Sequence, residues 1–288
     1  MSAAGWVLLV GGALVGLFVG SFCNVVIDRL PLALDAPNEY GELWDTNPWG
    51  HVLGVGEGAD SRSRCSSCGA QLRWSDNIPV ISYLALRGRC RSCGEPYGAY
   101  HLGVELFVPV GWLLVTWGVV HFQGWTWALV PYLFLVPVGA VVATIDLQTL
   151  IVPTRVVWPA AAIAAVMCVA AAGLEGEWSW VVGTAMGVVG LAGPLFLLWF
   201  ALPAGMGFGD VRLSVLLGMV VGLAAATTGL AWPWSLVLAV MAIALSSALG
   251  IVLAIVRRSR KVPFGPALVV GALVCITFAQ PILEPFGR

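Results

Sequence analysis

The sequence predicts an all-α polytopic membrane protein of about eight transmembrane helices, with a small cytoplasmic four-cysteine domain between the first and second helices. Hydrophobic residues make up 59% of the 288 residues and charged residues only 10%, whereas soluble domains carry about 25% charged residues. The mean hydropathy is +0.92. This composition excludes a soluble enzyme, and the lipid bilayer is the expected environment. No nucleic-acid partner is predicted.

The apolar residues gather in eight runs of the length that a bilayer core requires, roughly 20 residues per helix. No Lys or Arg precedes the first run and no small-residue cleavage site follows it, so we expect a retained helix rather than a cleaved signal peptide. The predicted spans are residues 5–26, 105–121, 125–145, 155–173, 179–200, 211–229, 233–256 and 264–283. The chain therefore divides into a first transmembrane helix (1–26), a polar domain (27–104) and a transmembrane domain (105–288).

The distribution of basic residues predicts the orientation in the membrane. Residues 27–104 hold seven of the 14 Lys and Arg residues, and cytoplasmic loops are enriched in both. If the N-terminus lies outside, the loops after the third, fifth and seventh spans add one, one and four more, which leaves only Arg288 outside. We therefore expect both termini outside and the polar domain in the cytoplasm. Asp146 and Asp210, at the ends of the third and sixth spans, then lie at the same cytoplasmic face.

These two aspartates are the strongest functional signal in the apolar part of the chain. A carboxylate at membrane depth is costly, so it indicates function by default. Two carboxylates that face each other could share one proton and activate a water molecule, as in aspartic proteases. Each aspartate also has a structural interpretation: Asp210 as the N-cap of its helix, and Asp146 as the polar end of a helix that Pro153 terminates.

Glycines surround the second aspartate. Gly205, Gly207 and Gly209 precede Asp210 at alternate positions. Glycine lets another backbone approach closely and adopts backbone angles that are closed to other residues. We expect these three glycines and Pro153 to support the site by shaping the approach to the carboxyl pair.

Four cysteines in the polar domain predict a metal site. Cys65-x-x-Cys68 and Cys90-x-x-Cys93 are 21 residues apart, close to the spacing of four-thiolate zinc sites. Because cytoplasmic thiols stay reduced, zinc is preferred to disulfides. We expect one tetrahedral Zn²⁺ that stabilises a domain with few apolar runs, and so a structural rather than a catalytic role.

Five segments, in the same order, resemble the type IV prepilin peptidases, which are aspartic membrane proteases of the G-x-G-D class. The four-cysteine region resembles the family's own, and Asp146 stands at the position of the first catalytic aspartate. The four-cysteine region includes Asn77-Ile-Pro-Val-Ile-Ser-Tyr83 and Leu86-Arg-Gly-Arg-Cys90. The other three matching segments are Gly20-Ser-Phe-Cys-Asn-Val-Val-Ile-Asp-Arg-Leu-Pro31, Gly207-Phe-Gly-Asp210 and Pro263-Phe-Gly-Pro266. The resemblance covers nearly the whole chain.

The resemblance implies an enzyme of the bacterial plasma membrane in which Asp146 and Asp210 are the catalytic pair. It implies cleavage of the short basic leader from prepilins or pseudopilins at the cytoplasmic face. It also implies N-methylation of the new N-terminus with S-adenosylmethionine by the cytoplasmic domain. Gln148 and Thr154 depart from the usual family pattern but spare both catalytic positions. Tyr100-His101-Leu102 departs from it in the cytoplasmic domain and bears on methylation.

Two other functions stay open from the residues alone. An ion- or proton-coupled transporter would use the two acids as a relay, and it favours acids deep within spans and inverted repeats. A zinc-containing membrane assembly protein would use the cysteine domain to dock a partner, and it leaves the acid-and-glycine motif unexplained.

Overall fold

The computed structural model describes residues 3–35, 48–53, 63–65, 67–203, 205–258 and 262–286, and these residues are helical apart from turns and two isolated β-bridges. They form two compact units, Met1–Val110 and Gly111–Arg288. In order, the elements are α1 (Ala3–Asp35), α2 (Pro48–Leu53), η1 (Trp74–Asn77), α3 (Ile81–Ala85), α4 (Tyr100–Gln123), α5 (Leu129–Thr149), α6 (Thr154–Glu175), α7 (Ser179–Ala201), α8 (Phe208–Ala226), α9 (Pro233–Arg257), α10 (Gly265–Thr277), α11 (Ala279–Leu283) and η2 (Glu284–Phe286).

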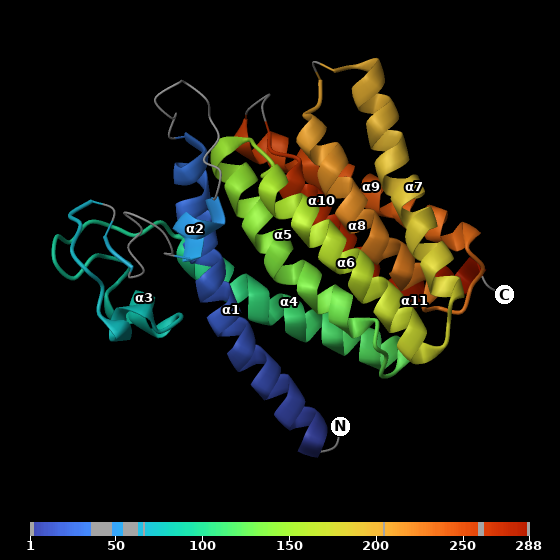
Figure 1. Cartoon of the computed structure of the whole chain (residues 1–288), viewed down its shortest axis with the longest axis horizontal. Helices are drawn as coiled ribbons and strands as arrows, with labels where there is room; N and C mark the ends of the chain where they lie inside the picture. Colours follow the sequence, from blue (N-terminus) through green and yellow to red (C-terminus); the bar gives the residue numbers. More distant parts are fainter. Residues whose placement is uncertain are drawn as a thin grey trace. The chain divides into compact units, whose positions relative to one another are not determined.

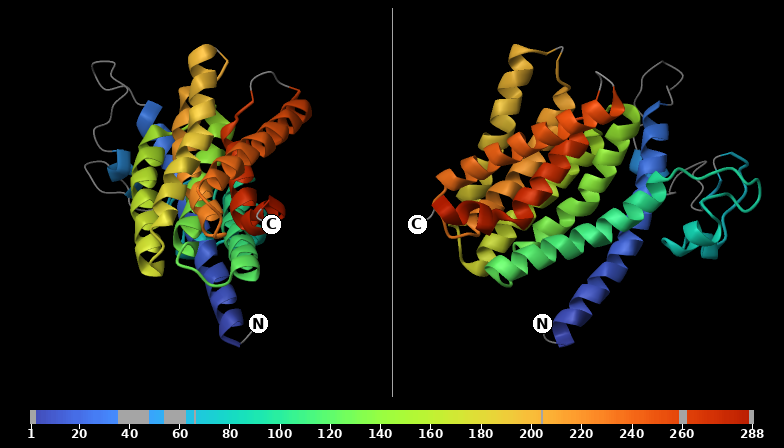
Figure 2. Two further views of the ribbon diagram at one scale, coloured as in Figure 1. Left: turned by 90° about the vertical axis from the view of Figure 1, so that its right-hand side faces the viewer. Right: turned by 180° about the vertical axis from the view of Figure 1, so that it is seen from behind.

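The second unit is a helix bundle with α8 at its centre. Figures 1 and 2 show α5, α6, α8 and α10 running side by side. Of the 18-residue apolar stretch in each helix, 72% is buried inside the protein in α8 and 67% in α5, whereas only 22% is buried in α9. The two helices that carry the predicted aspartates are therefore the most enclosed spans, and most of α9 lies on the outside of the bundle.

Small residues let α7 and α8 approach closely. A Cβ added at Gly187 would lie 2.2 Å from the Gly218 carbonyl oxygen, and one added at Gly222 would lie 2.3 Å from the Gly183 carbonyl oxygen. Two glycines spaced four apart on each helix thus form a seam in which the backbones touch. Membrane helices commonly associate through small residues at this spacing. Within lipid there is no hydrophobic driving force between helices, so their association depends on close van der Waals packing.

The predicted transmembrane architecture is confirmed, with one difference in the last span. Among the described residues, seven helices are long and apolar enough to cross a membrane. The eighth predicted span, 264–283, is broken: α10 ends at Thr277, and the segment that follows it turns by 80°. Pro281 explains the break, because it has no N–H to donate to the Thr277 carbonyl and its ring crowds that group.

The first unit contains an interface between α1 and the start of α4. Cβ atoms added at Gly16 and Gly20 would each lie 2.9 Å from a backbone carbon of α4, at Pro109 and Glu105. One turn further, Asn24 Nδ2 donates to the His101 carbonyl at 3.0 Å. Helix α1 continues to Asp35, beyond the predicted end of the first span. The sequence predicts a loop over the glycine-rich stretch 50–58, but its first residues belong to α2 (Pro48–Leu53), and residues 54–58 lie outside the described residues. Residues 259–261 of the basic loop after α9 also lie outside them.

Candidate active site and metal centre

Asp146 lies near the end of α5, where the chain turns. Helix α5 ends at Thr149, and Leu150 adopts a left-handed conformation with φ 58° while its N–H donates to the Asp146 carbonyl at 2.9 Å. The sequence suggested that Pro153 terminates this helix, but the helix ends before Pro153, at Thr149. Pro153 is the N-cap of α6, with extended backbone angles that suit proline. The Asp146 residue is only 3% exposed.

Asp210 lies in the first turn of α8. The helix begins at Phe208 with Gly207 as its N-cap, so Asp210 is the third helical residue. The interpretation of Asp210 as an N-cap is therefore wrong. A carboxylate in the first turn is still favourably placed with respect to the helix dipole. Its residue is half-buried, so it remains accessible from one side.

Packing between the turn after α5 and the start of α8 brings the two aspartates together. A Cβ at Gly209 would lie 2.8 Å from Val152 Cβ, so only glycine fits against this turn. The carboxyl groups are close enough for Asp146 to act electrostatically on Asp210. Two residues that are 64 positions apart in the chain thus form one pair at the ends of neighbouring helices.

The three glycines before Asp210 have different roles from those predicted. Gly205, Gly207 and Gly209 all lack the positive φ that would demand glycine. A Cβ at Gly205 would meet nothing closer than 3.4 Å, and one at Gly207 nothing closer than 4.0 Å. Gly209 alone is required by close packing. Gly207 faces the open side of the pair, where its nearest neighbours include Asp210 Oδ2.

Two contacts at this end of the bundle were missed from the sequence. The Gly265 N–H at the start of α10 donates to Asp146 Oδ2 at 2.9 Å, and this bond is buried. Arg212 donates to the Thr154 hydroxyl and lies 4.8 Å from the centre of the Phe208 ring, which ties the start of α8 to the start of α6. The Pro-Phe-Gly-Pro segment marked Gly265 in the sequence, but no local pattern identified Asp146 as its hydrogen-bond partner.

The four predicted metal ligands converge in the first unit. The Sγ atoms of Cys65, Cys68, Cys90 and Cys93 all lie within 4.8 Å of one another, and Cys65 Sγ is 3.8 Å from Cys93 Sγ. Tetrahedral zinc with Zn–S bonds of about 2.3 Å separates its sulfurs by about 3.8 Å. The thiols therefore fit a four-thiolate zinc site, with two ligands buried and two exposed.

Two matching turns present these thiols. In the first, the Gly69 N–H donates to the Cys65 carbonyl at 2.9 Å, and in the second the Gly94 N–H donates to the Cys90 carbonyl at 2.9 Å. Both glycines have positive φ, 68° and 74°, which the second Cys-Gly step of each pair needs. Each turn also closes with one isolated antiparallel bridge. The pairs are thus a local structural repeat, which was not predicted from the sequence.

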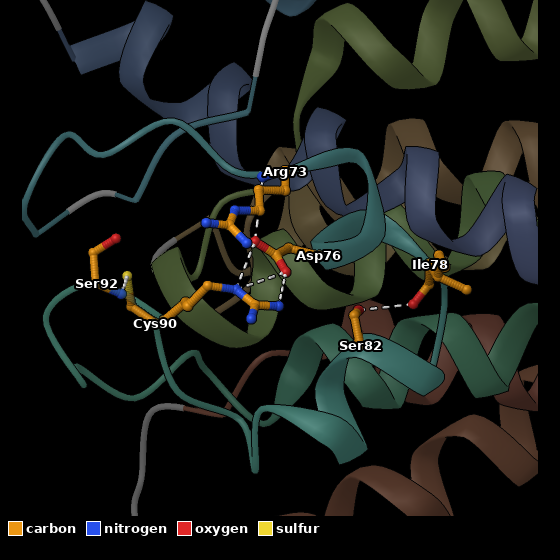
Figure 3. A network of polar contacts seen from close by, with 7 residues as sticks. Arg73, Asp76, Ile78, Ser82, Cys90 and Ser92 are labelled. Carbon is orange, nitrogen blue, oxygen red and sulfur yellow. Dashed lines mark hydrogen bonds and ion pairs between the residues drawn. The ribbon is translucent and has the colours of Figure 1, made fainter.

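The residues around the cluster are polar and well connected. Figure 3 shows Asp76 beside Arg73, whose backbone N–H donates to the Asp76 carboxylate at 3.2 Å, while Arg91 Nη2 donates to the same carboxylate at 2.6 Å. The backbone N–H groups of Cys93 and Ser92 lower the pKa of the Cys90 thiol to about 6, whereas burial and the neighbouring thiols raise the pKa of Cys93. The thiolate is the form of cysteine that binds zinc.

In the first unit, Glu105 holds a strained turn in place through a hydrogen bond. Val80 has φ 63° and ψ −49°, and the Ile81 N–H donates to the Pro79 carbonyl at 2.6 Å, which makes a γ-turn of the rarer, strained kind. The Val80 N–H donates to the buried Glu105 carboxylate at 2.8 Å. A β-branched residue at positive φ persists only where its surroundings hold it, so Glu105 fixes the Asn77–Tyr83 segment.

Two family models match this chain. Residues 14–119 match the bacterial peptidase A24 N-terminal domain, and residues 133–255 match the type IV leader peptidase family. A Burkholderia pseudomallei (strain 1026b) protein is 33% identical over 94% of this chain and 86% of its own length. A Neisseria gonorrhoeae protein is 30% identical over 92% of this chain and 88% of its own length.

A Myxococcus xanthus protein is 33% identical over 70% of this chain, and the match spans only 53% of that relative's length. All three relatives are named prepilin leader peptidase/N-methyltransferase. No solved structure gives a significant match. The two family matches together cover most of the chain, and two relatives align over nearly their full length. The chain therefore belongs to the type IV leader peptidase family.

Proposed function

We propose that this chain is a membrane aspartic endopeptidase that removes the leader from prepilins or prepilin-like proteins. The observation that carries the proposal is the pairing of Asp146 and Asp210 at the ends of α5 and α8, one buried and one half-buried. The names of the relatives supply the substrate class. Prepilins and pseudopilins share a short basic leader, and either class suits the site.

The carboxyl pair supports a water-activation mechanism. Two neighbouring carboxylates do not both ionise cheaply, so we expect the pair to share one proton. One carboxyl takes a proton from the water as the water oxygen attacks the scissile carbonyl. The other gives its proton to the carbonyl oxygen. The carboxyl that took the water proton then gives it to the leaving amine as the C–N bond breaks, and the other carboxyl recovers its proton from a hydroxyl of the tetrahedral intermediate. The burial of Asp146 keeps bulk water from competing for the pair, and the open side of Asp210 admits the substrate.

The cleavage face follows from the charge distribution. Seven of the 14 basic residues lie in 27–104, which supports a cytoplasmic position for the four-cysteine domain and an outer position for both termini. The carboxyl pair then opens to the cytoplasm. A substrate with basic residues before its cleavage site keeps those residues on the same side, because basic segments resist translocation.

The four-cysteine domain supports a second activity. The relatives carry N-methyltransferase in their names, which supports methylation of the new N-terminus with S-adenosylmethionine as methyl donor. Cys65, Cys68, Cys90 and Cys93 would hold one Zn²⁺. Four thiolates close the coordination sphere, so the ion would stabilise the fold and not bind substrate. We assign the zinc site and the methyltransferase activity to a domain spanning residues 27–104.

One experiment separates the two activities. Purified protein is incubated with a prepilin, with and without S-adenosylmethionine, and the mature N-terminus is read by mass spectrometry. The proposal predicts a shortened pilin in both samples and an added methyl group of about 14 Da only when the methyl donor is present. A pilin of unchanged mass in both samples would exclude the peptidase.

The two competing functions make other predictions. A proton-coupled transporter would move a solute across sealed vesicles and leave prepilin intact, and a zinc-containing assembly protein would bind a partner without changing its mass. Asp146→Asn and Asp210→Asn variants that stay folded but lose cleavage separate the peptidase from both alternatives.

A further inference from the structure

The start of α10 carries a hydrogen bond that neither the charge pattern nor the acid-and-glycine motif explains. Gly265 is the first residue of this helix and Pro266 the second. The first N–H groups of a helix have no partner within it, and proline has none to offer. The Gly265 N–H donates to Asp146 Oδ2 at 2.9 Å, across 119 positions of sequence.

A side chain at position 265 would displace the Asp146 carboxyl group. A Cβ added at position 265 would lie 2.7 Å from Asp146 Oδ2 and 3.3 Å from its Cγ. Backbone conformation does not require glycine here, because φ is not in the positive region. The requirement is therefore steric, and it is directed at the carboxyl group itself.

The two aspartates of the pair differ in the hydrogen bonds that hold their carboxyl groups. A buried backbone N–H holds one oxygen of Asp146, and a hydrogen bond to a carboxylate is stronger and more directional than one between neutral groups. Among the described residues, no protein group donates to the Asp210 carboxyl. Asp146 is thus held in one orientation, while Asp210 meets solvent and its partner.

We propose that Gly265 is a positioning residue for the peptidase. Its N–H holds Asp146 Oδ2, so the second carboxyl oxygen is the one left for the shared proton and the water. Its missing side chain lets α10 approach closely enough to make that bond. This inference rests on the proposed function, because it gives Asp146 a catalytic part.

The test compares Gly265→Ala with Gly139→Ala. Gly139 lies on α5 and faces α10, where an added Cβ would lie 2.6 Å from Val269 Cγ1, so the control disturbs the same helix pair away from the carboxyl group. A displacement near 1 Å at a reacting group costs about 100-fold in rate. We expect Gly265→Ala to lower kcat about 10- to 100-fold with KM changed less than about threefold. Gly139→Ala should keep kcat within about threefold per folded molecule. Equal losses of kcat in the two variants would overturn the proposal.

A double variant covers the case in which Gly265→Ala folds poorly. Asp146→Ala removes the carboxyl group and frees the space that the new Cβ needs. The Asp146→Ala/Gly265→Ala protein should therefore melt at the same temperature as Asp146→Ala alone, a coupling that a double-mutant cycle measures. A double variant that remains as unstable as Gly265→Ala overturns the inference. Cleavage by folded Asp146→Asn or Asp210→Asn would instead refute the proposed function, and the melting cycle would still stand.

Discussion

Gly209→Ala tests whether packing at the start of α8 sets the geometry of the carboxyl pair. The added Cβ would lie 2.8 Å from Val152 Cβ and 3.3 Å from its Cγ2. Carbon atoms pack at about 3.5 to 4.0 Å, so the helix start and the turn after α5 must separate by about 1 Å. Asp210 is the next residue and moves with the backbone. Because 1 Å of misplacement costs about 100-fold in rate, we expect kcat to fall about 10- to 100-fold.

The same motif supplies the matched control. A Cβ at Gly207 would meet nothing closer than 4.0 Å, so Gly207→Ala should lower kcat less than about threefold. Both variants are assayed on one prepilin in detergent, with kcat and KM expressed per folded molecule and folding checked by thermal melting. Losses of similar size in Gly207→Ala and Gly209→Ala would refute the packing argument, because only one of the two glycines is sterically required.

The four-cysteine unit offers three further tests. Glu105→Gln weakens the acceptor of the Val80 N–H by about 1 kcal/mol, so hydrogen exchange at that amide should quicken about fivefold; an unchanged rate contradicts the assigned bond. Cys65→Ser should reduce bound zinc, measured by elemental analysis, from one per chain to well below one and expose residues 67–99 to added protease; full zinc content refutes the ligand set. The hydrogen bond from Arg91 lowers the pKa of Asp76 below its usual range, so this pair stabilises the folded unit above about pH 4, and the contribution is lost as pH falls through the lowered pKa. Asp76→Asn should therefore flatten the acid limb of melting temperature against pH, and an unaltered limb counts against the pairing.

The transmembrane architecture was predictable because each span is encoded locally. Apolar runs of the required length and the residues that interrupt them identified seven long helices, with boundaries wrong by a few residues. The last span shows the limit of this reasoning. Its apolar run is continuous enough to predict one helix, but Pro281 removes a donor and crowds Thr277, so the helix breaks. That signal was present in the sequence and was outweighed by hydropathy.

The site was predictable in part. The positive-inside pattern put Asp146 and Asp210 at one face, and the structure brings their side chains within electrostatic reach. The contacts that fix them were not predictable. Val152 against Gly209 and the Gly265 N–H on Asp146 join segments 57 and 119 residues apart, and no local periodicity encodes such contacts. The cysteine cluster, by contrast, was predictable, because each Cys-x-x-Cys turn is determined by its own spacing and by the glycine that directly follows it.

The most direct test of the central claim is the cleavage rate of Asp146→Asn, Asp210→Asn and the double variant. Asparagine keeps the size of aspartate and most of its hydrogen-bonding capacity, so lost activity is not a packing effect. Residues that act as one unit lose their function together. We therefore predict that each single variant abolishes leader cleavage, read by mass spectrometry of the pilin N-terminus, nearly as completely as the double variant. Leader cleavage by a folded Asp210→Asn protein at a rate near that of the unaltered protein would contradict the account.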